Sequence, residues 1–186
     1  MKNCNIVNLV EEITQSVAQY INNNNLTLIF DTDVEEKIVA CDLDKIERIM
    51  LNLLSNSIKF TELGGSIFVN IIDGDECITI TVEDNGIGIP KEKLNIIFDR
   101  FRQVDKSFTR NYEGSGIGLS LVKSLVEMQG GTICVESKYE VGTKFTINFP
   151  VKQLNYDEVE LKLKSVDTTI NDNVQRIKIE FSDIYK

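Results

Sequence analysis

The sequence predicts a mixed α/β protein with one hydrophobic core. Several stretches place apolar residues at the spacing of an amphipathic helix, and short runs rich in β-branched residues lie between them. The chain has 186 residues, of which 42% are hydrophobic and 26% charged, as is ordinary for a soluble globular protein. This length allows one domain, which we place at residues 1–150, and an appendage at residues 151–186.

The first 41 residues are predicted to form a helix followed by two strands. Helical spacing over residues 3–21 aligns the apolar side chains of Ile6, Leu9, Val10, Ile13, Val17 and Tyr20. Four consecutive asparagines at 22–25 end this helix. Residues 26–31 and 37–41 are rich in β-formers and are joined by an acidic turn, so we expect two short strands.

Residues 42–61, DLDKIERIMLNLLSNSIKFT, are predicted to form the central helix. Its apolar stripe consists of Leu43, Ile46, Met50, Leu53 and Leu54. Either Asp42 or Asp44 can cap its N-terminus, and Glu47 stands three residues after Asp44, which is the spacing of a capping box.

This helix carries a second, polar arc that core packing does not require. Asn52 and Asn56 are one helical turn apart, and Lys59 and Phe60 follow one turn later. Amide oxygens suit a hydrated Mg²⁺, an ammonium group suits a phosphate oxygen, and a phenyl ring can lie against a base. The alternative is a solvated helix face that happens to carry two asparagines.

The remaining regular elements are two hairpins and a helix. Residues 66–72 and 77–83 are predicted to pair around an Asp-Gly-Asp turn, and residues 132–137 and 143–149 to pair before Pro150. The helix runs from a glycine-rich turn to residue 129 and ends at two glycines. We expect its inward residues to be Leu119, Val122, Leu125, Val126 and Met128.

The first hairpin leads into Asp84-Asn85-Gly86-Ile87-Gly88-Ile89-Pro90. Glycines cost chain entropy and offer no side chain to pack, so we interpret Gly86 and Gly88 as letting the backbone approach a flat ligand. If Asp84 faces a purine, its carboxylate accepts an amino N–H of adenine and repels the carbonyl oxygen of guanine. A glycine turn with an Asx hydrogen bond is the alternative.

The segment between this loop and the last helix is predicted to contain a short helix, a lid and an anion-binding turn. Pro90 suits the start of a helix over 91–97, and residues 105–115 show no periodicity, as in a mobile lid. The turn at 114–118 offers backbone N–H groups to an anion at the helix N-terminus. It is not a Walker loop, because no Gly-Lys-Ser/Thr follows, and it is not a dinucleotide fingerprint, because Leu119 stands where the third spaced glycine would be.

Composition excludes several function classes. A net charge of −9 argues against nucleic-acid binding. The absence of histidine excludes a Ser-His-Asp triad, an imidazole base and a histidine-containing zinc site.

No apolar run is long enough to cross a bilayer, and no signal peptide opens the chain. The four cysteines are scattered singly, so we expect them to be reduced, buried, small apolar residues of a cytosolic protein.

In this order, the motifs resemble those of the ATP-binding catalytic domain of bacterial two-component sensor histidine kinases, within the GHKL superfamily. NLLSNSIKFT resembles the N box, DNGIGIP the first glycine box and IFDRFRQVD the F box; GSGIGLSLVKSLVEMQGG and GTKFTINFP resemble the second and third glycine boxes. The resemblance implies a two-layer α/β (α+β) sandwich. Its mixed β-sheet would be covered on one face by helices, with ATP held between the helices and the lid.

The resemblance also implies a role for each motif residue. Asn56 would bind Mg²⁺ with support from Asn52, and Lys59 would contact phosphate. Phe60 would line the base pocket. The adenine site would be formed by Asp84, Gly86, Gly88 and Thr143, and the phosphates would be held by the second glycine turn with Gly114, Ser115, Gly116, Gly118 and Leu119.

One position departs from the family pattern. Gln103 stands where many relatives carry an arginine that serves the γ-phosphate. Arg100, Arg102 or Arg110 would then serve the γ-phosphate instead, and we include Arg102 and Arg110 among the expected catalytic residues.

The implied activity is transfer of the γ-phosphoryl group of Mg-ATP to a histidine. Superfamily ATPases place a glutamate base where Asn52 stands, and an amide cannot accept a proton from water, which favours transfer over hydrolysis. The acceptor histidine would lie on a separate helical hairpin domain for dimerisation and phosphotransfer, upstream in the parent chain or in trans. A response regulator would be an indirect partner.

This assignment implies a cytoplasmic domain without a membrane segment of its own, whether or not the parent kinase is membrane-anchored. The alternatives are a superfamily ATPase, a protein-serine kinase of the anti-sigma type, and a non-catalytic, nucleotide-dependent interaction module. For the tail at 151–186, alternating apolar residues leave edge strands and partial disorder as alternatives.

Overall fold

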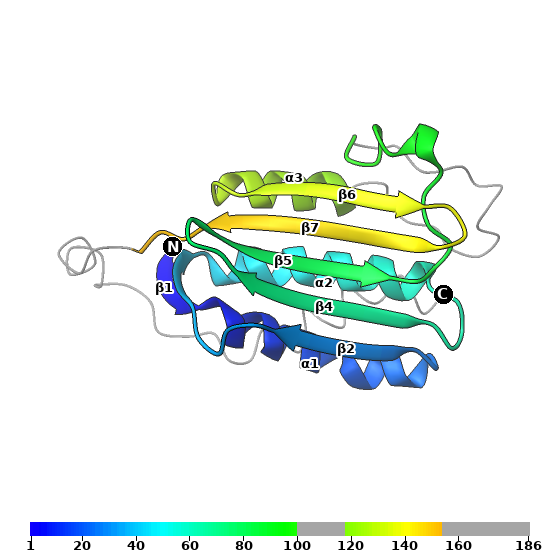
Figure 1. Ribbon diagram of the computed structural model, residues 1–186, viewed down its shortest axis with the longest axis horizontal. Helices are drawn as coiled ribbons and strands as arrows, with labels where there is room; N and C mark the ends of the chain where they lie inside the picture. Colours follow the sequence, from blue (N-terminus) through cyan, green and yellow to red (C-terminus); the bar gives the residue numbers. More distant parts are fainter. Residues whose placement is uncertain (100–117, 154–186) are drawn as a thin grey trace.

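The computed structural model describes residues 1–99 and 118–153, and in this part of the chain three helices cover one face of a five-stranded sheet (Figure 1). The strand order is β2-β4-β5-β7-β6. β2 and β4 are parallel and the other neighbours are antiparallel, so the sheet is mixed. The predicted two-layer sandwich is confirmed.

The sheet strands and the covering helices lie close to the predicted segments. The strands are β2 (Thr27–Thr32), β4 (Ser66–Asp73), β5 (Cys77–Asp84), β6 (Thr132–Lys138) and β7 (Gly142–Pro150). The helices are α1 (Ile6–Asn23), α2 (Leu43–Phe60) and α3 (Gly118–Met128). The helix predicted over 91–97 is only a 3₁₀ turn at Lys91–Lys93.

The core lies between the sheet and the helices, with α2 in the middle, packed against both α1 and α3. Alternate residues of the central strands point into it. The predicted stripe of α2 is confirmed, with Leu43 half-buried and the other four residues almost fully buried. Met128 was expected to face inward but is 65% exposed. The buried face of α3 continues instead at Gln129, three and four residues after Val126 and Leu125.

The N-terminus differs from the prediction. Lys2–Asn5 forms a short strand, β1, instead of the first turn of the helix, and pairs antiparallel with β3 (Ile38–Cys41). The helix starts only at Ile6 because Asn5 caps it, accepting the N–H of Val7 at 3.2 Å. The predicted strand at 37–41 is therefore present but lies outside the main sheet.

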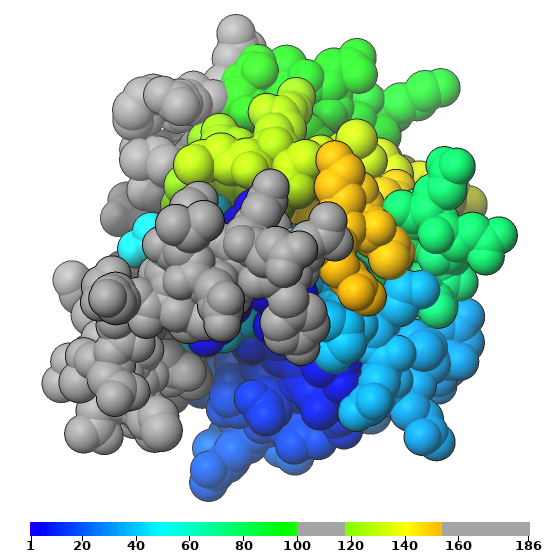
Figure 2. Space-filling model, turned by 90° about the vertical axis from the view of Figure 1, so that its left-hand side faces the viewer, coloured from blue at the N-terminus to red at the C-terminus, as the bar shows by residue number. Residues whose placement is uncertain are grey.

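The chain after β7 packs beside this small sheet. Figure 2 shows residues near 150 in orange against the light-blue segment that contains β3, and the Ala40 N–H donates to the Lys152 carbonyl at 2.6 Å. Residues 154–186, which include most of the predicted tail, lie outside the described residues.

The expectation of four reduced, buried cysteines is wrong. The pairing of β1 with β3 brings Cys4 and Cys41 together, with their Cα atoms 6.7 Å apart, and they form a disulfide. Cys77 is half-buried and Cys134 is exposed, and both are free. The long-range β1–β3 register decides this pairing, and single cysteines in a sequence do not reveal it.

The start of α2 is capped by Asp42, which accepts the Lys45 N–H at 3.3 Å. The alternative cap, with Asp44 and Glu47 as a capping box, is therefore wrong. The Asp42 N–H donates to the side chain of Gln129 at 2.7 Å, which ties the start of α2 to the end of α3. None of the helices within residues 1–99 and 118–153 combines the length and apolarity needed to cross a bilayer.

Candidate functional site

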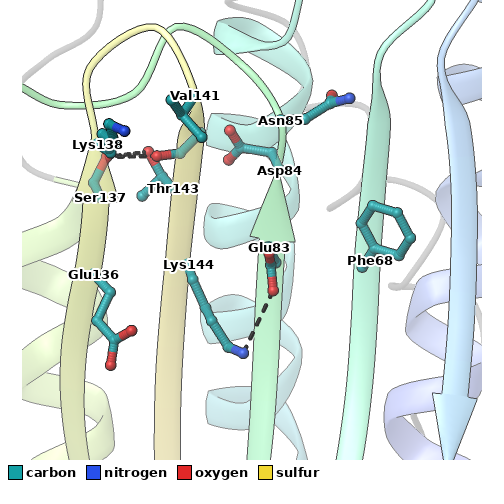
Figure 3. A pocket seen from close by; sticks show the side chains of 11 residues that line it. Phe68, Glu83, Asp84, Asn85, Glu136, Ser137, Lys138, Val141, Thr143 and Lys144 are labelled. Carbon is teal, nitrogen blue, oxygen red and sulfur yellow. Dashed lines mark hydrogen bonds and ion pairs between the residues drawn. The ribbon is translucent and has the colours of Figure 1, made fainter.

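A row of polar side chains crosses the sheet at the end where β5 stops and β7 begins. The strand registers place Asp84 on β5 opposite Thr143 on β7, and Thr143 opposite Ser137 on β6 (Figure 3). The next row inward on the same face, formed by Val82, Phe145 and Val135, is apolar. The hydrophobic core therefore ends at a polar edge beneath the helices.

Asp84 is the most buried acid of this edge, with 6% of its surface exposed. Its carboxylate accepts hydrogen bonds from the Ser57 hydroxyl on α2 at 3.0 Å and from the Gly86 N–H at 3.1 Å. Burial raises the pKa of Asp84, and the hydrogen bonds from Gly86, Ser57 and the backbone of Thr143 oppose this rise. A carboxylate has about four acceptor positions, so the hydrogen bonds from Ser57 and Gly86 leave acceptor capacity for a ligand that donates a hydrogen bond.

The polar arc of α2 lies at the same end of the molecule. The side-chain nitrogen of Asn52 donates to the Arg48 carbonyl at 3.2 Å, and its oxygen faces the first residue of α3. A Cβ built on Gly118 would lie only 2.7 Å from that oxygen, so glycine lets α3 start close to α2. The amide oxygen of Asn52 and the N-terminus of α3, with its partial positive charge, are thus neighbours.

Lys59 and Phe60 complete this arc at the end of α2. The Lys59 ammonium lies 5.5 Å from the centroid of the Phe60 ring. The Phe60 carbonyl accepts the Ile87 N–H at 3.0 Å, which joins the helix end to the loop after Asp84. Asn56, one turn before Phe60, is half-buried.

The two glycines of this loop have neighbours within the protein. A Cβ on Gly86 would lie 2.2 Å from the Phe60 carbonyl oxygen, and one on Gly88 would lie 2.1 Å from that of Lys138. Gly88 also has a φ of +65°, which glycine adopts readily. Close packing against α2 and the β6–β7 turn thus accounts for both glycines, whereas close approach to a flat ligand stays a prediction.

A hollow of about 350 Å³ lies at the same sheet edge and opens on the uncovered face (Figure 3). Phe68, Glu83 and Lys144 line it from the outer face, with Lys144 and Glu83 joined in a 3.4 Å ion pair. It reaches the polar row from the side opposite α2. The polar row therefore separates this hollow from the polar arc of the helix.

Several predicted site residues lie outside the described residues: Arg100, Arg102, Gln103, Arg110, Gly114, Ser115 and Gly116. The structure brings the other predicted residues to one end of the sandwich, including Gly118 and the half-buried Leu119 at the start of α3. Their assignment to phosphate, metal and base stays a prediction.

Two residues of the site were missed in the sequence. Ser57 supports Asp84, and Ser137 contacts Thr143 with 3.0 Å between the two hydroxyl oxygens. The sequence does carry a pattern that could have revealed both. Ser57 lies in the apolar stripe of α2, three and four residues after Leu54 and Leu53. Ser137 follows Ile133 and Val135 at the inward-facing positions of its strand. A small polar residue at a buried position implies a hydrogen-bond partner.

Comparison with known proteins decides the family. Residues 41–153 match the model of a family described as "Histidine kinase-, DNA gyrase B-, and HSP90-like ATPase". The chain belongs to this family. Among solved structures, the catalytic domain of the histidine kinase ThkA is similar to this ATPase-family domain at 26% identity and a TM-score of 0.71, over 82% of this chain and 99% of that chain.

Curated relatives place this ATPase-family chain with the histidine kinases. It is 41% identical to the autoinducer 2 sensor kinase/phosphatase LuxQ of Vibrio cholerae over 148 residues, covering 77% of this chain and 17% of LuxQ. It is 33% identical to histidine kinase P4 of Formosa agariphila over 183 residues, covering 97% of this chain and 13% of that protein. The chain thus contains a catalytic ATPase domain of the histidine-kinase type and spans less than a fifth of either relative.

Proposed function

We propose that this domain binds Mg-ATP at the polar edge of the sheet and transfers the γ-phosphoryl group to a histidine on another domain. The observation that carries the proposal is the position of Asp84. This buried carboxylate keeps acceptor capacity at the end where α2 carries Asn52, Asn56 and Lys59, and Asn52 lies beside the start of α3. Base, metal and phosphate groups therefore have chemically matched residues within one site.

The residues divide by chemistry. Asp84 accepts the adenine amino group, and Thr143 lies next to it on the sheet. Asn56, with Asn52 one turn earlier, offers the amide oxygens that suit a hard cation. Lys59 and the N-terminus of α3 offer positive charge to the phosphates. Bound Mg²⁺ would neutralise phosphate charge, and the residues of this chain hold and align the nucleotide.

Transfer is favoured over hydrolysis by the amide at position 52. The Asn52 side chain donates to the Arg48 carbonyl and cannot serve as a general base for an attacking water. Phosphoryl transfer needs alignment and charge neutralisation, which this site offers. The chain contains no histidine, so the phospho-acceptor must come from outside these 186 residues.

The partners follow from this requirement. A helical hairpin domain that carries the acceptor histidine, in the parent protein or in trans, is the direct partner. One ThkA structure, 26% identical with a TM-score of 0.68, contains that kinase in complex with the response regulator TrrA. By analogy, we propose a response regulator as the indirect partner of this domain.

Incubation of the whole chain with labelled Mg-ATP and a histidine-bearing hairpin domain tests the proposal. Acid-labile phosphate on the hairpin is the expected result. Acid-stable phosphoserine would support a serine kinase, phosphate release without transfer a superfamily ATPase, and tight binding without chemistry an interaction module. Each of these three results would overturn histidine phosphorylation as the function.

Replacement of Asn56 by alanine tests the metal assignment. Asn56→Ala should abolish the increase in ATP affinity that Mg²⁺ gives, measured by calorimetry with Mg²⁺ and with a chelator. Asn70→Ala is the matched control, because Asn70 is also half-buried but lies on β4 at the opposite face of the sheet. Equal Mg²⁺ dependence in the parent and in Asn56→Ala would remove Asn56 from the metal site.

A further inference from the structure

The hydroxyl group of Ser137 takes part in three hydrogen-bond contacts. Its hydroxyl oxygen accepts the Ile89 N–H at 2.8 Å, its proton is donated to the Gly142 carbonyl at 2.8 Å, and it lies 3.0 Å from the Thr143 hydroxyl oxygen. A serine hydroxyl has one proton and two acceptor positions. Because the proton is used on Gly142, the Thr143 hydroxyl must be the donor in the third contact.

This arrangement fixes the direction of the Thr143 hydroxyl. Its proton points toward Ser137, so its oxygen offers only lone pairs to a neighbouring ligand. Thr143 is buried and lies opposite Asp84 on the adjoining strand. The two side chains at the edge therefore both present hydrogen-bond acceptors.

Two acceptors side by side distinguish the purines. Adenine carries an amino group, a donor, at the ring position where guanine carries a carbonyl oxygen, an acceptor. Acceptors that both face this position pair with the two amino hydrogens of adenine and leave the guanine carbonyl oxygen against like partial charges. A freely rotating threonine hydroxyl would instead donate to the guanine carbonyl and weaken this distinction.

Ser137 also anchors the loop that follows Asp84. Besides the Ile89 N–H bond, the Glu140 N–H donates to the Ile87 carbonyl at 2.8 Å, and Gly88 packs against the Lys138 carbonyl. The β6–β7 turn thus holds residues 86–89 at a fixed distance from Thr143. Figure 3 shows the hydrogen bond between the side chains of Ser137 and Thr143, which lie on the two strands that this turn connects.

We propose that Ser137 is a positioning residue for base selectivity: it orients the Thr143 hydroxyl as an acceptor and thereby favours adenine over guanine nucleotides. The inference rests on the proposed function, because it assumes that the base lies at Asp84 and Thr143. Ser137 acts through Thr143 and Ile89.

The test is the ratio of Mg-GTP to Mg-ATP dissociation constants, measured by calorimetry with the whole chain. Ser137→Ala should lower this ratio about tenfold, the effect of one hydrogen bond. Ser137→Thr, which keeps the hydroxyl, should restore most of the ratio. Ser16→Ala is the control, because it removes a similar hydroxyl–carbonyl bond, to Ile13, on the distant helix α1.

The outcomes separate positioning from mere stabilisation. A structural role alone would weaken ATP and GTP by the same factor, and an unchanged ratio in Ser137→Ala would overturn the inference while leaving ATP binding in place. If Ser137→Ala does not fold, Thr143→Val removes the oriented hydroxyl itself, and an unchanged ratio there would overturn it equally. Failure of the unaltered chain to bind ATP would overturn the proposed function and the inference together.

Discussion

At the scale of single residues, Asp84 shows how a charge is kept inside this domain. An isolated buried carboxylate is expensive, and its cost falls only when donors surround it. Here two donors come from two different segments, Ser57 on α2 and Gly86 on the following loop, and the backbone of Thr143 on β7 also lowers the pKa of Asp84. Since burial still raises the pKa of Asp84, these donors compensate only part of the cost.

Replacement of Asp84 by asparagine should weaken ATP binding more than tenfold with the fold intact. The amide keeps the size of the side chain but removes the charge that pairs with an amino donor. Calorimetry measures the affinity and circular dichroism the fold. Glu83→Gln is the matched control, because the adjacent Glu83 points to the uncovered face and pairs with Lys144. Unchanged affinity in Asp84→Asn would show that the base binds elsewhere.

The raised pKa of Asp84 gives a pH dependence with a defined sign. ATP affinity should fall as the pH is lowered through the pKa of Asp84, which lies above the ordinary 3.8, because the neutral acid is a weaker acceptor. Binding measured from neutral pH downward tests this. An affinity that stays constant until the pH reaches 3.8 would contradict it.

The same group affects stability in the opposite direction. A raised folded-state pKa means that the proton binds more tightly to the folded chain, so this contribution to stability is present below 3.8 and lost as the pH rises through the folded pKa. Asp84→Asn does not titrate. As the pH rises from 3.8 through the folded-state pKa of Asp84, the free energy of unfolding of Asp84→Asn, measured by urea melts, should therefore increase relative to that of the parent.

At the scale of elements, α2 serves the core and the site with two adjacent arcs. Leu53 and Leu54 are fully buried, while Asn52 and Asn56 on the neighbouring arc are half-buried. Ser57, on the core side, reaches Asp84. Because one rigid helix carries both arcs, core packing sets the positions of the polar side chains.

Leu53→Ala should lower the free energy of unfolding by roughly 2–5 kcal/mol, as for other buried leucine deletions. Leu63→Ala, at a side chain that is 79% exposed in the turn after α2, should change it by less than about 0.5 kcal/mol. Urea melts of both variants and the parent measure the difference. Equal midpoints for the two variants would mean that Leu53 does not belong to the core face.

At the scale of the whole molecule, the Cys4–Cys41 disulfide joins the N-terminal strand to the residue before the α2 cap. The linked residues are 37 positions apart, and Asp42, next in the chain, is held by Gln129 at the end of α3. The disulfide and the Gln129 contact therefore both reach the start of the helix that carries the site.

Cys4→Ser should lower the free energy of unfolding by about 2–4 kcal/mol under oxidising conditions, since the crosslink restricts the unfolded chain. A reductant should destabilise the parent by a similar amount and leave Cys4→Ser unchanged. Cys134→Ser, at an exposed free thiol, is the control. A parent whose urea midpoint ignores the reductant would contradict a role of the disulfide in stability.

Local sequence patterns predicted correctly those features of the fold that depend on residues close together in the sequence. The stripe of α2, the two hairpins and the glycines that end α3 were recognised from spacing alone, and the boundaries moved by only a few residues. The N-terminus was mispredicted because β1 exists only through its partner β3. Met128 was mispredicted because the buried face of α3 continues at the polar Gln129 instead.

By itself, the sequence determined the order of the three long helices and the five strands of the main sheet, the mixed α/β class and the family, because periodicity and motif spacing are properties of the linear chain. Only the tertiary structure decided that Cys4 meets Cys41, that Ser57 and Ser137 support Asp84 and Thr143, and that Gly86 and Gly88 pack against protein backbone. The physical reason is that each of these contacts joins segments far apart in sequence, and strand register and helix packing alone bring them within reach.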